Sequence, residues 1–380
     1  MENKNQRICI IGGGPAGTSM AMYLEKNGYD NYVIYEKSDR VGGKAFSPKM
    51  KVKNAQGKWE DRTIEMGAVM GCDTYFAVHE CEEFGGTTHV GGPPMGRKFM
   101  KVDGTPQKMS PIAMLKKLSK MKKLSKLLET KYKGYDVNGH RGISEGRYEG
   151  PCPSPEMKLA HIEGVNNHLK HPALLNSEVT DIKRENDKVF VTVNGKTEEF
   201  DKLIICTPLE LFLGYGDPRE EEKDLFSKIV HKEYFTMAVR PEEGNAPEIS
   251  YYFFENMTNE TRGHLMVFYH RWSDGVTDQP LVTFTLRNHE GMEDVPFDKA
   301  KETTLKDMEL CGLKVDKIER IDDWYYFPHV GSKDYADGWY EKVEAMQGKD
   351  NTFYAGEVMA FGDMEETVEY SRDLVRRFFK

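Results

Sequence analysis

The stretch RICIIGGGPAGTSMAMYLEKNGYDNYVIYE, residues 7–36, decides the fold. Its opening apolar run is typical of a strand buried in a parallel sheet, and glycines follow at positions 12, 14 and 17. Gly12 would permit a tight turn, Gly14 would let a pyrophosphate approach the backbone, and Gly17 would let the next helix pack against the strand. The pattern from Pro15 to Asn27 predicts that helix, whose N-terminus would face the phosphates.

A second apolar strand ends at Glu36, about 20 residues beyond the glycines, where dinucleotide-binding units carry an acidic residue. A carboxylate there would accept hydrogen bonds from a ribose hydroxyl group and would repel a 2′-phosphate, which disfavours NADP. The strand, glycines, helix, second strand and acid together predict a Rossmann-type unit. They leave open whether the nucleotide is FAD or NAD.

The composition indicates a globular chain that is large enough for more than one domain. The chain has 380 residues and a net charge of −9, so we expect no general nucleic-acid binding. It contains no run of about 18 apolar residues, so no membrane-spanning helix is expected. The polar first residues lead directly into a strand, so we expect no signal or transit peptide.

The cysteines predict a reducing, cytoplasmic location for the protein. None of the six forms a Cys-x-x-Cys pair, which is typical neither of a metal site nor of a disulfide framework. They are Cys9, Cys72, Cys81, Cys152, Cys206 and Cys311. We therefore expect no bound metal.

Two glycine-containing stretches after Glu36 favour FAD over NAD. They are KSDRVGGKAFS, residues 37–47, and TIEMGAVMG, residues 63–71. These stretches resemble the large flavoprotein superfamily that includes the monoamine oxidases and phytoene desaturases. The resemblance implies that the loop with Gly42 and Gly43 lies by the FAD phosphates, and that the backbone of Gly67–Ala68 approaches the flavin.

The C-terminal stretch NTFYAGEVMAFGDMEETVEYSRDLVRRFF, residues 351–379, resembles the same superfamily. It predicts a strand, a turn at Ala355–Glu357 and a helix from about Met364, which would return to the nucleotide-binding domain. No second G-x-G-x-x-G occurs between a predicted strand and helix. We therefore expect a flavoenzyme that takes its hydride from the substrate rather than from a nicotinamide.

The residues that this resemblance assigns to the cofactor come from three separate parts of the chain. They are Gly12, Gly14, Pro15, Ala16, Gly17, Glu36, Lys37, Arg40, Gly42, Gly43, Lys44, Gly67, Ala68, Val179, Thr207, Gly356, Glu357, Thr367 and Val368. Among them, Glu357 is expected at ribityl or phosphate groups, Val179 on the adenine side, and Thr367 and Val368 near the flavin ring.

A coarse map of the chain predicts an alternation between two domains. The FAD-binding domain would comprise residues 1–71, 165–210 and 330–380. The substrate domain would comprise residues 72–164, helical and shortened, and 211–329, where the runs ISYYFFEN, HLMVFYHRW and LVTFTLRN predict an antiparallel sheet. The predicted fold class is α/β: a Rossmann-type FAD-binding domain with an inserted mixed α+β substrate domain, discontinuous and amine-oxidase-like.

Several stretches of the second half narrow the resemblance to one family. They are HRWSDG, TLRNHE, WYYFPHVGSKDYADGWYEKVEAMQG and NTFYAGEVMAFG, and TKYKGYDVNGH, residues 130–140, agrees with them. They resemble the polyenoic fatty acid isomerases, bacterial FAD proteins that turn linoleic acid into a conjugated isomer. The resemblance extends from Arg7 to Lys380.

This family resemblance implies a reaction that needs no catalytic side chain. Flavin N5 would take a hydride from the methylene between two cis double bonds and return it to a terminal carbon of the resulting cation. The product is a conjugated diene, without net redox change. The expected cofactor is FAD, and the expected substrate is a free polyunsaturated fatty acid.

Four residues are predicted to bind the substrate. Arg97, in GGPPMGRKFMKVDG, would hold the carboxylate, since arginine suits its bidentate recognition, and Lys98 would share this role. Tyr326 and Phe327 would form the wall of the flavin site or of the substrate tunnel. The family's helical cap is replaced here by residues 141–166, a shorter segment rich in Pro, Gly and Ser, so we expect a more open tunnel.

Two other functions stay open at this stage. One is an FAD-dependent oxidase or desaturase acting on an amine or a lipid, in which oxygen reoxidises the flavin. The other is a flavoprotein that binds FAD or lipid with little turnover.

Residues 110–133 predict a basic amphipathic helix. The segment has leucine and methionine residues at helical spacing, eight lysines and one acidic residue, Glu129. It would either contact anionic lipid at a membrane surface or place its apolar stripe on the protein core and its lysines in solvent.

Overall fold

The computed structural model covers most of the two predicted domains. It describes residues 4–67, 76–87, 97–108, 110–112, 115–116, 119, 158–242, 245, 247, 249–272, 275–289, 291–360 and 364–380. The predicted contact of Ala68, most of the predicted basic helix and the predicted short cap up to residue 157 lie outside the described residues.

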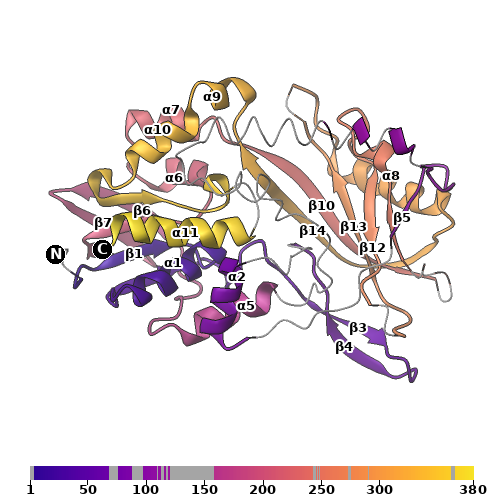
Figure 1. The fold of residues 1–380 in the computed structure, drawn as a ribbon, viewed down its shortest axis with the longest axis horizontal. Coiled ribbons are helices and arrows are strands. Elements are labelled where there is room, and N and C mark those ends of the chain that lie inside the picture. Colours follow the sequence, from indigo (N-terminus) through magenta and orange to yellow (C-terminus); the bar gives the residue numbers. More distant parts are fainter. Residues whose placement is uncertain are drawn as a thin grey trace.

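A parallel four-stranded sheet forms the centre of one half of the molecule (Figure 1). Its strand order is β15-β9-β1-β2. The strands are β1 (Ile8–Ile11), β2 (Tyr32–Tyr35), β9 (Lys202–Ile205) and β15 (Thr352–Tyr354). All four residues of β1 are buried, as expected for an apolar strand between two parallel neighbours. The sheet thus joins the beginning, middle and end of the chain.

Four helices pack together beside this sheet. They are α1 (Pro15–Lys26), α2 (Phe76–Gly85), α5 (Lys158–His168) and α11 (Met364–Phe378). The Glu365 carboxylate of α11 accepts hydrogen bonds from the backbone amides of Ala77 and Val78, both at 2.9 Å. These amides belong to the first turn of α2, which has no partners for them within the helix, so Glu365 ties the two helices together.

The same half contains an antiparallel three-stranded sheet and several short helices. The sheet comprises β6 (Val179–Glu185), β7 (Lys188–Val193) and β8 (Lys196–Phe200). Asn194 and Gly195 join β7 to β8 with φ values of 50° and 75°, as a two-residue hairpin turn requires. The helices are α6 (Leu209–Tyr215), α7 (Glu220–Phe226), α9 (Ser332–Ala336), α10 (Trp339–Met346), η2 (Lys349–Asn351) and η3 (Glu357–Met359).

A six-stranded sheet forms the other half of the molecule (Figure 1). In spatial order its strands are β14 (Val315–His329), β10 (Val230–Pro241), β13 (Leu281–Leu286), β12 (Leu265–Tyr269), β11 (Ser250–Tyr252) and β5 (Arg97–Phe99). Neighbouring strands are antiparallel except β11 and β5, which are parallel. The antiparallel arrangement predicted for residues 211–329 is therefore confirmed.

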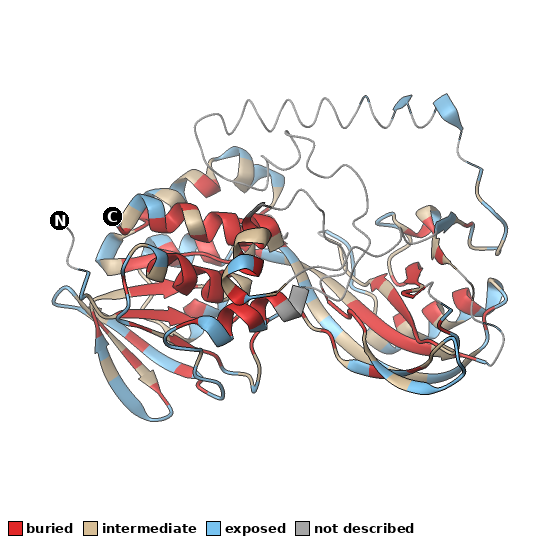
Figure 2. Cartoon of the chain, turned by 60° about the horizontal axis from the view of Figure 1, so that its bottom comes forward, coloured by how far each residue is buried: buried red, intermediate tan, exposed pale blue. Residues whose placement is uncertain are grey.

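The two faces of the six-stranded sheet have different partners. One face packs against α8 (Phe297–Leu310) through a core that includes Phe235, Phe268 and Met308. The other face contacts the hairpin of β3 (Lys49–Lys53) and β4 (Trp59–Thr63). A short helix, η1 (Phe254–Asn256), follows β11. Buried residues accordingly lie in the parallel sheet with its helices and along the six-stranded sheet (Figure 2).

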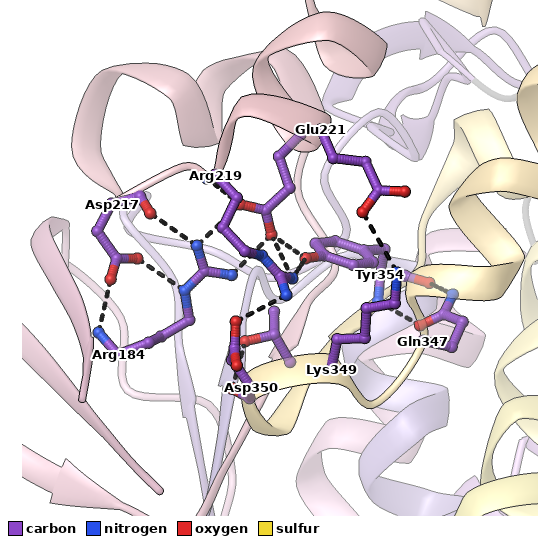
Figure 3. Close-up of polar contacts among 10 residues, drawn as sticks. Arg184, Asp217, Arg219, Glu221, Gln347, Lys349, Asp350 and Tyr354 are labelled. Carbon is purple, nitrogen blue, oxygen red and sulfur yellow. Dashed lines mark hydrogen bonds and ion pairs between the residues drawn. The ribbon is translucent and has the colours of Figure 1, made fainter. Parts of the chain in front are cut away.

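A buried ion network joins β6, α7 and β15 (Figure 3). The Arg184 guanidinium donates to both carboxylate oxygens of Glu222, at 2.7 and 2.8 Å, and to Asp217 Oδ1 at 2.7 Å. Glu222 is fully buried and also accepts from Arg219 and from the Tyr354 hydroxyl. Burial opposes ionisation of Glu222, but these hydrogen bonds outweigh it and lower its pKa to about 2.

None of the helices in the described part of the chain is long and apolar enough to cross a membrane.

Candidate cofactor and substrate site

Two of the glycines after β1, Gly12 and Gly17, leave little or no room for side chains. A Cβ at Gly17 would lie 1.8 Å from the Gly12 carbonyl oxygen, so α1 can approach β1 only with glycine there. Gly12 has φ 105°, and a Cβ there would lie 3.0 Å from Thr207 Cγ2. Thr207 directly follows Cys206, whose amide donates to Ile11 beside the carboxyl end of β1. The predicted residues Gly12, Gly17 and Thr207 therefore meet at one edge of the parallel sheet.

The first turn of α1 faces the glycine pair Gly42–Gly43. Gly14, the N-cap of α1, makes no side-chain cap hydrogen bond, and Pro15 and Ala16 follow it in the first turn. A Cβ at Gly14 would meet nothing closer than the Gly43 Cα, at 3.9 Å. The Gly42 amide donates to the Gly13 carbonyl at 2.9 Å, which holds the two segments together. This backbone cradle, which a side chain would fill, fits a pyrophosphate at a helix N-terminus.

The Glu36 carboxylate is held by backbone amides. Gly13 N donates to Oε2 at 2.7 Å, and Ser38 N donates to Oε1 at 2.8 Å. Each oxygen keeps a second lone pair, so the predicted contact with a ribose hydroxyl group fits this geometry. The Glu36 carbonyl accepts from Ser177 N at 2.8 Å, which brings Val179 to this side of the sheet, whereas Lys37 is exposed.

The Arg40 side chain makes hydrogen bonds across the loop that contains Gly42 and Gly43. Its guanidinium donates to the carbonyls of Gly43, at 2.8 Å, and of Val41, at 3.1 Å. It also lies 4.4 Å from the centre of the Phe46 ring. Burial lowers the pKa of Arg40. The contacts show Arg40 ordering the loop, a role that the sequence did not indicate.

An ion pair connects the N-terminal and C-terminal parts of the predicted cofactor site. Lys44 Nζ contacts Glu357 Oε2, and Glu357 Oε1 accepts from Phe327 N at 3.0 Å. Gly356 precedes Glu357 with φ 101°, and a Cβ there would lie 3.3 Å from the Cys206 carbonyl oxygen. The sequence predicted Lys44 and Glu357 separately but contained no signal that they pair, since 313 residues separate them.

Gly67 lies between Lys44 and Tyr326. A Cβ at Gly67 would lie 1.8 Å from the Lys44 carbonyl oxygen and 3.1 Å from the Tyr326 hydroxyl. That hydroxyl is buried and makes no hydrogen bond within the described structure. Burial and the charges of Glu357 and Glu65 raise the pKa of Tyr326, so its phenol is a hydrogen-bond donor at neutral pH.

Thr367 and Val368 lie in α11, where both are buried. Val368 lines a small cavity together with Pro15 and Thr18 of α1. The neighbouring Ser371 hydroxyl donates to the Ala16 carbonyl at 3.2 Å. The two predicted residues are therefore next to the first turn of α1. The described residues contain no group of acidic, histidine or cysteine side chains that could hold a metal ion.

A row of aromatic rings crosses the six-stranded sheet. We call it the aromatic row; its members are Phe99, Tyr252, Tyr269, Phe284, Tyr234 and Tyr326. Ring centroids lie 6.0 Å apart for Phe99 and Tyr252, 5.8 Å for Tyr252 and Tyr269, and 5.5 Å for Tyr269 and Phe284. At the other edge, Tyr234 and Tyr326 are 6.1 Å apart. Phe284 pairs with Thr236, two residues from Tyr234, so both rings lie on the same face of the sheet. The row therefore extends from β5 to β14, whose Tyr326 lies beside Gly67.

Arg97 and Lys98 lie at the β5 end of the aromatic row, and both are exposed. The Arg97 guanidinium lies 5.9 Å from the Phe99 ring, whereas Lys98 Nζ lies 6.0 Å from the ring of Tyr251. Successive residues of a strand point to opposite faces, and Tyr251 packs on the α8 side of the sheet. The structure thus brings Arg97, but not Lys98, to the face of the aromatic row.

Phe327 adopts a strained backbone beside the row. Its φ is 50°, which bulky residues rarely adopt, and the residue is 48% exposed. Its ring centroid lies 6.0 Å from that of Tyr234. The hydrogen bond from Phe327 N to Glu357 holds this conformation in place.

Comparisons with known proteins agree with this geometry. Residues 6–214 match the family model described as pyridine nucleotide-disulphide oxidoreductase. A solved structure of a CLA-producing fatty acid isomerase from P. acnes is 36% identical to this chain, with a TM-score of 0.87 and 100% of both chains covered.

More distant relatives share parts of the sequence or the fold alone. A curated FAD-dependent oxidoreductase from Cochliobolus heterostrophus is 26% identical over 234 residues, 56% of this chain and 47% of that protein. The chain thus spans about half the length of this curated relative. A cyclohexylamine oxidase from Brevibacterium oxydans has the same fold at 13% identity, with a TM-score of 0.68 over 98% of both chains.

Proposed function

Because the chain belongs to the pyridine nucleotide-disulphide oxidoreductase family and to that of the fatty acid isomerases, we propose that it isomerises polyunsaturated fatty acids. It is an FAD-dependent enzyme. The reaction moves a double bond to give a conjugated diene. The aromatic row is the structural observation that carries this proposal, since it offers an apolar path from Arg97 to the surroundings of Gly67.

The cofactor-binding residues act by positioning. Bound FAD supplies the hydride acceptor. The cradle between Gly14 and Gly43 receives the pyrophosphate, and Glu36 receives a ribose hydroxyl group. The Lys44–Glu357 ion pair joins the N-terminal and C-terminal parts of this site, and the Lys44 carbonyl packs against Gly67, which has no side chain to block that contact. We assign residues 1–71, 165–210 and 330–380 to the FAD-binding domain, and 72–164 and 211–329 to the substrate domain, except that α2, α5 and α7 pack in the half with the parallel sheet and are grouped with the FAD-binding domain.

The substrate-binding residues orient an acyl chain across the sheet. Arg97 binds the carboxylate, and the aromatic row packs against the hydrocarbon and excludes water. Tyr326 and Phe327 form the end of this path. No side chain has to gain or lose a proton, since the proton count of the substrate does not change.

Anaerobic incubation of the purified holoenzyme with linoleic acid tests the proposal. We expect the conjugated-diene absorbance band to rise without oxygen, and no oxygen uptake when the experiment is repeated in air. Hydrogen peroxide production in air would contradict the proposal and indicate an oxidase or desaturase. Retention of the yellow flavin without any product would indicate a protein that only binds FAD or lipid.

The role of Arg97 is tested with the free acid and its methyl ester. We expect Arg97→Ala to raise KM for the free acid several-fold more than for the ester, because only the acid carries the charge that the guanidinium binds. Lys98→Ala is the matched control, since Lys98 is the adjacent cation on the opposite face of β5. Equal effects of Arg97→Ala on the two substrates would refute the carboxylate role.

We further propose that residues 110–133 contact anionic membranes and thereby bring the enzyme to its substrate. Ile112 and Leu115 lie in this segment and are 67% and 66% exposed. We expect the protein to co-sediment with vesicles of anionic lipid and not with vesicles of neutral lipid. Equal behaviour with both vesicles would instead favour a helix whose lysines are simply solvated.

A further inference from the structure

Arg271 is a buried arginine that the functional assignment above does not use. It lies two residues beyond β12 and is 5% exposed. Its backbone is held firmly, since Arg271 N and Trp272 N both donate to Gln279 Oε1, at 2.8 and 3.2 Å. Gln279 Nε2 donates in turn to the Trp272 carbonyl at 2.8 Å. The backbone at Arg271 is therefore fixed by hydrogen bonds within the connection between β12 and β13.

Most of the hydrogen-bonding capacity of the Arg271 guanidinium is unused. Nη2 donates to the Glu65 carbonyl at 3.0 Å, but Nε and Nη1 are buried and make no hydrogen bond in the part of the chain that the structure describes. Arg184, the other deeply buried arginine discussed above, uses Nε, Nη1 and Nη2 in hydrogen bonds. A buried, charged donor without an acceptor is costly, which indicates that a ligand supplies one.

The Glu65 carbonyl places this guanidinium beside the predicted flavin contact. Gly67 is two residues from Glu65, and the unpaired Tyr326 hydroxyl lies next to Gly67. The Glu65 carboxylate is buried and accepts from the Ser47 hydroxyl, so it provides a nearby counter-charge. Two donors from distant parts of the sequence, Arg271 and Tyr326, therefore adjoin the same short segment of backbone, Glu65 to Gly67.

Two ligands could lie beside Arg271 and Tyr326, the fatty acid and FAD, and their chemistry favours FAD. The hydrocarbon of a fatty acid has no acceptor for these donors, and positive charge on the substrate would be repelled by a guanidinium. The isoalloxazine ring of FAD has carbonyl oxygens and ring nitrogens that accept hydrogen bonds. A guanidinium also stabilises the negative charge that hydride acceptance places on the ring. A planar fork of donors matches adjacent acceptors of this kind.

We propose that Arg271 donates hydrogen bonds to the isoalloxazine ring of FAD and, through its charge, raises the reduction potential of the bound flavin. Arg271 is thus a residue that tunes the cofactor for accepting a hydride. This inference rests on FAD binding and not on the identity of the substrate.

The midpoint potential of the bound flavin tests this role. In Arg271→Gln holoenzyme, we expect the equilibrium constant for two-electron reduction to fall about tenfold, which corresponds to a potential about 30 mV lower. Arg271→Lys, which keeps the charge without the fork, should lie between Arg271→Gln and the wild type. If Arg271→Gln does not retain FAD, the comparison of Arg271→Lys with the wild type carries the test.

Arg240→Gln is the matched control. Arg240 is also largely buried in this sheet, but its guanidinium donates to Glu319, to the Asp278 carbonyl and to the Lys51 carbonyl, at 2.8 Å in the first and last cases. Its loss should lower stability and leave the potential unchanged. An unchanged potential in both Arg271 variants would overturn the proposal. If the two Arg271 variants instead lost the preference for the free acid over the methyl ester, the partner of Arg271 would be the substrate carboxylate. That result would also overturn the proposal.

Discussion

Replacing Glu222 by glutamine should remove a large part of the stabilisation of the FAD-binding half. The fall in its pKa from 4.5 to about 2 corresponds to about 3 kcal/mol of stabilisation by the ionised form. The value agrees with the roughly 3–5 kcal/mol lost when one partner of a buried ion pair is removed. Since Arg184 would then be buried beside a neutral amide, we expect calorimetry to show a Tm lower by on the order of 10 °C.

The adjacent residue provides the control for Glu222→Gln. The Glu221 side chain is 48% exposed and pairs with Lys349 at 3.3 Å, so Glu221→Gln should change stability by less than about 1 kcal/mol. Both carboxylates belong to α7, and Figure 3 labels Glu221 beside the network. Equal losses of Tm in the two variants would refute the assignment of the stabilisation to the buried network.

The pH dependence gives a second test of the same reasoning. Glu222 has a lowered pKa in the folded protein, so its stabilisation is fully present above about pH 4.5 and is lost as the pH falls towards 2. The Tm difference between the wild type and Glu222→Gln should therefore narrow over this range. A difference independent of pH would contradict the argument.

Two further predictions concern the packing of α1 and α2. Gly17→Ala should lose FAD, measured as the flavin-to-protein absorbance ratio, because the new Cβ would lie 1.8 Å from the Gly12 carbonyl oxygen. Gly214→Ala is the control and should keep FAD, because its Cβ would have no atom within 4 Å. Full FAD content in Gly17→Ala would contradict the packing argument. Glu365→Gln should lower the free energy of unfolding by about 1 kcal/mol and speed amide hydrogen exchange at Ala77 and Val78, because it removes a negative charge from the N-terminus of α2. Unchanged exchange at both amides would show that the charge is not needed.

The secondary structure of the nucleotide-binding motifs follows closely from local sequence signals. The helix predicted from Pro15 extends to Lys26, with Gly28 just beyond it at φ 83°. The helix predicted from about Met364 begins at that residue. Such signals act over a few residues, because glycine conformation and helix ends depend on the nearby backbone. The predicted fold class, cofactor and family are confirmed by the comparisons.

The site residues were harder to predict because each depends on contacts between distant segments. Lys98 and Arg97 are neighbours in the sequence, but the pairing of β5 with β11 determines which of the two lies on the face of the aromatic row. Arg271 lies in the quoted HRWSDG stretch, but nothing in the neighbouring sequence indicates that its guanidinium is buried and only partly hydrogen-bonded. The residue roles proposed for the FAD and substrate sites stay predictions.

The sequence by itself determined the Rossmann-type unit, the nucleotide that it binds and the family of the chain. These properties are encoded in the spacing of glycines and in motifs that work within one strand, turn and helix. Only the tertiary structure decided that Lys44 pairs with Glu357, that six strands align one aromatic row, and that Arg271 is buried beside Gly67. The physical reason is that partners of a buried charge or ring are chosen by proximity in the folded chain, which local sequence patterns do not specify.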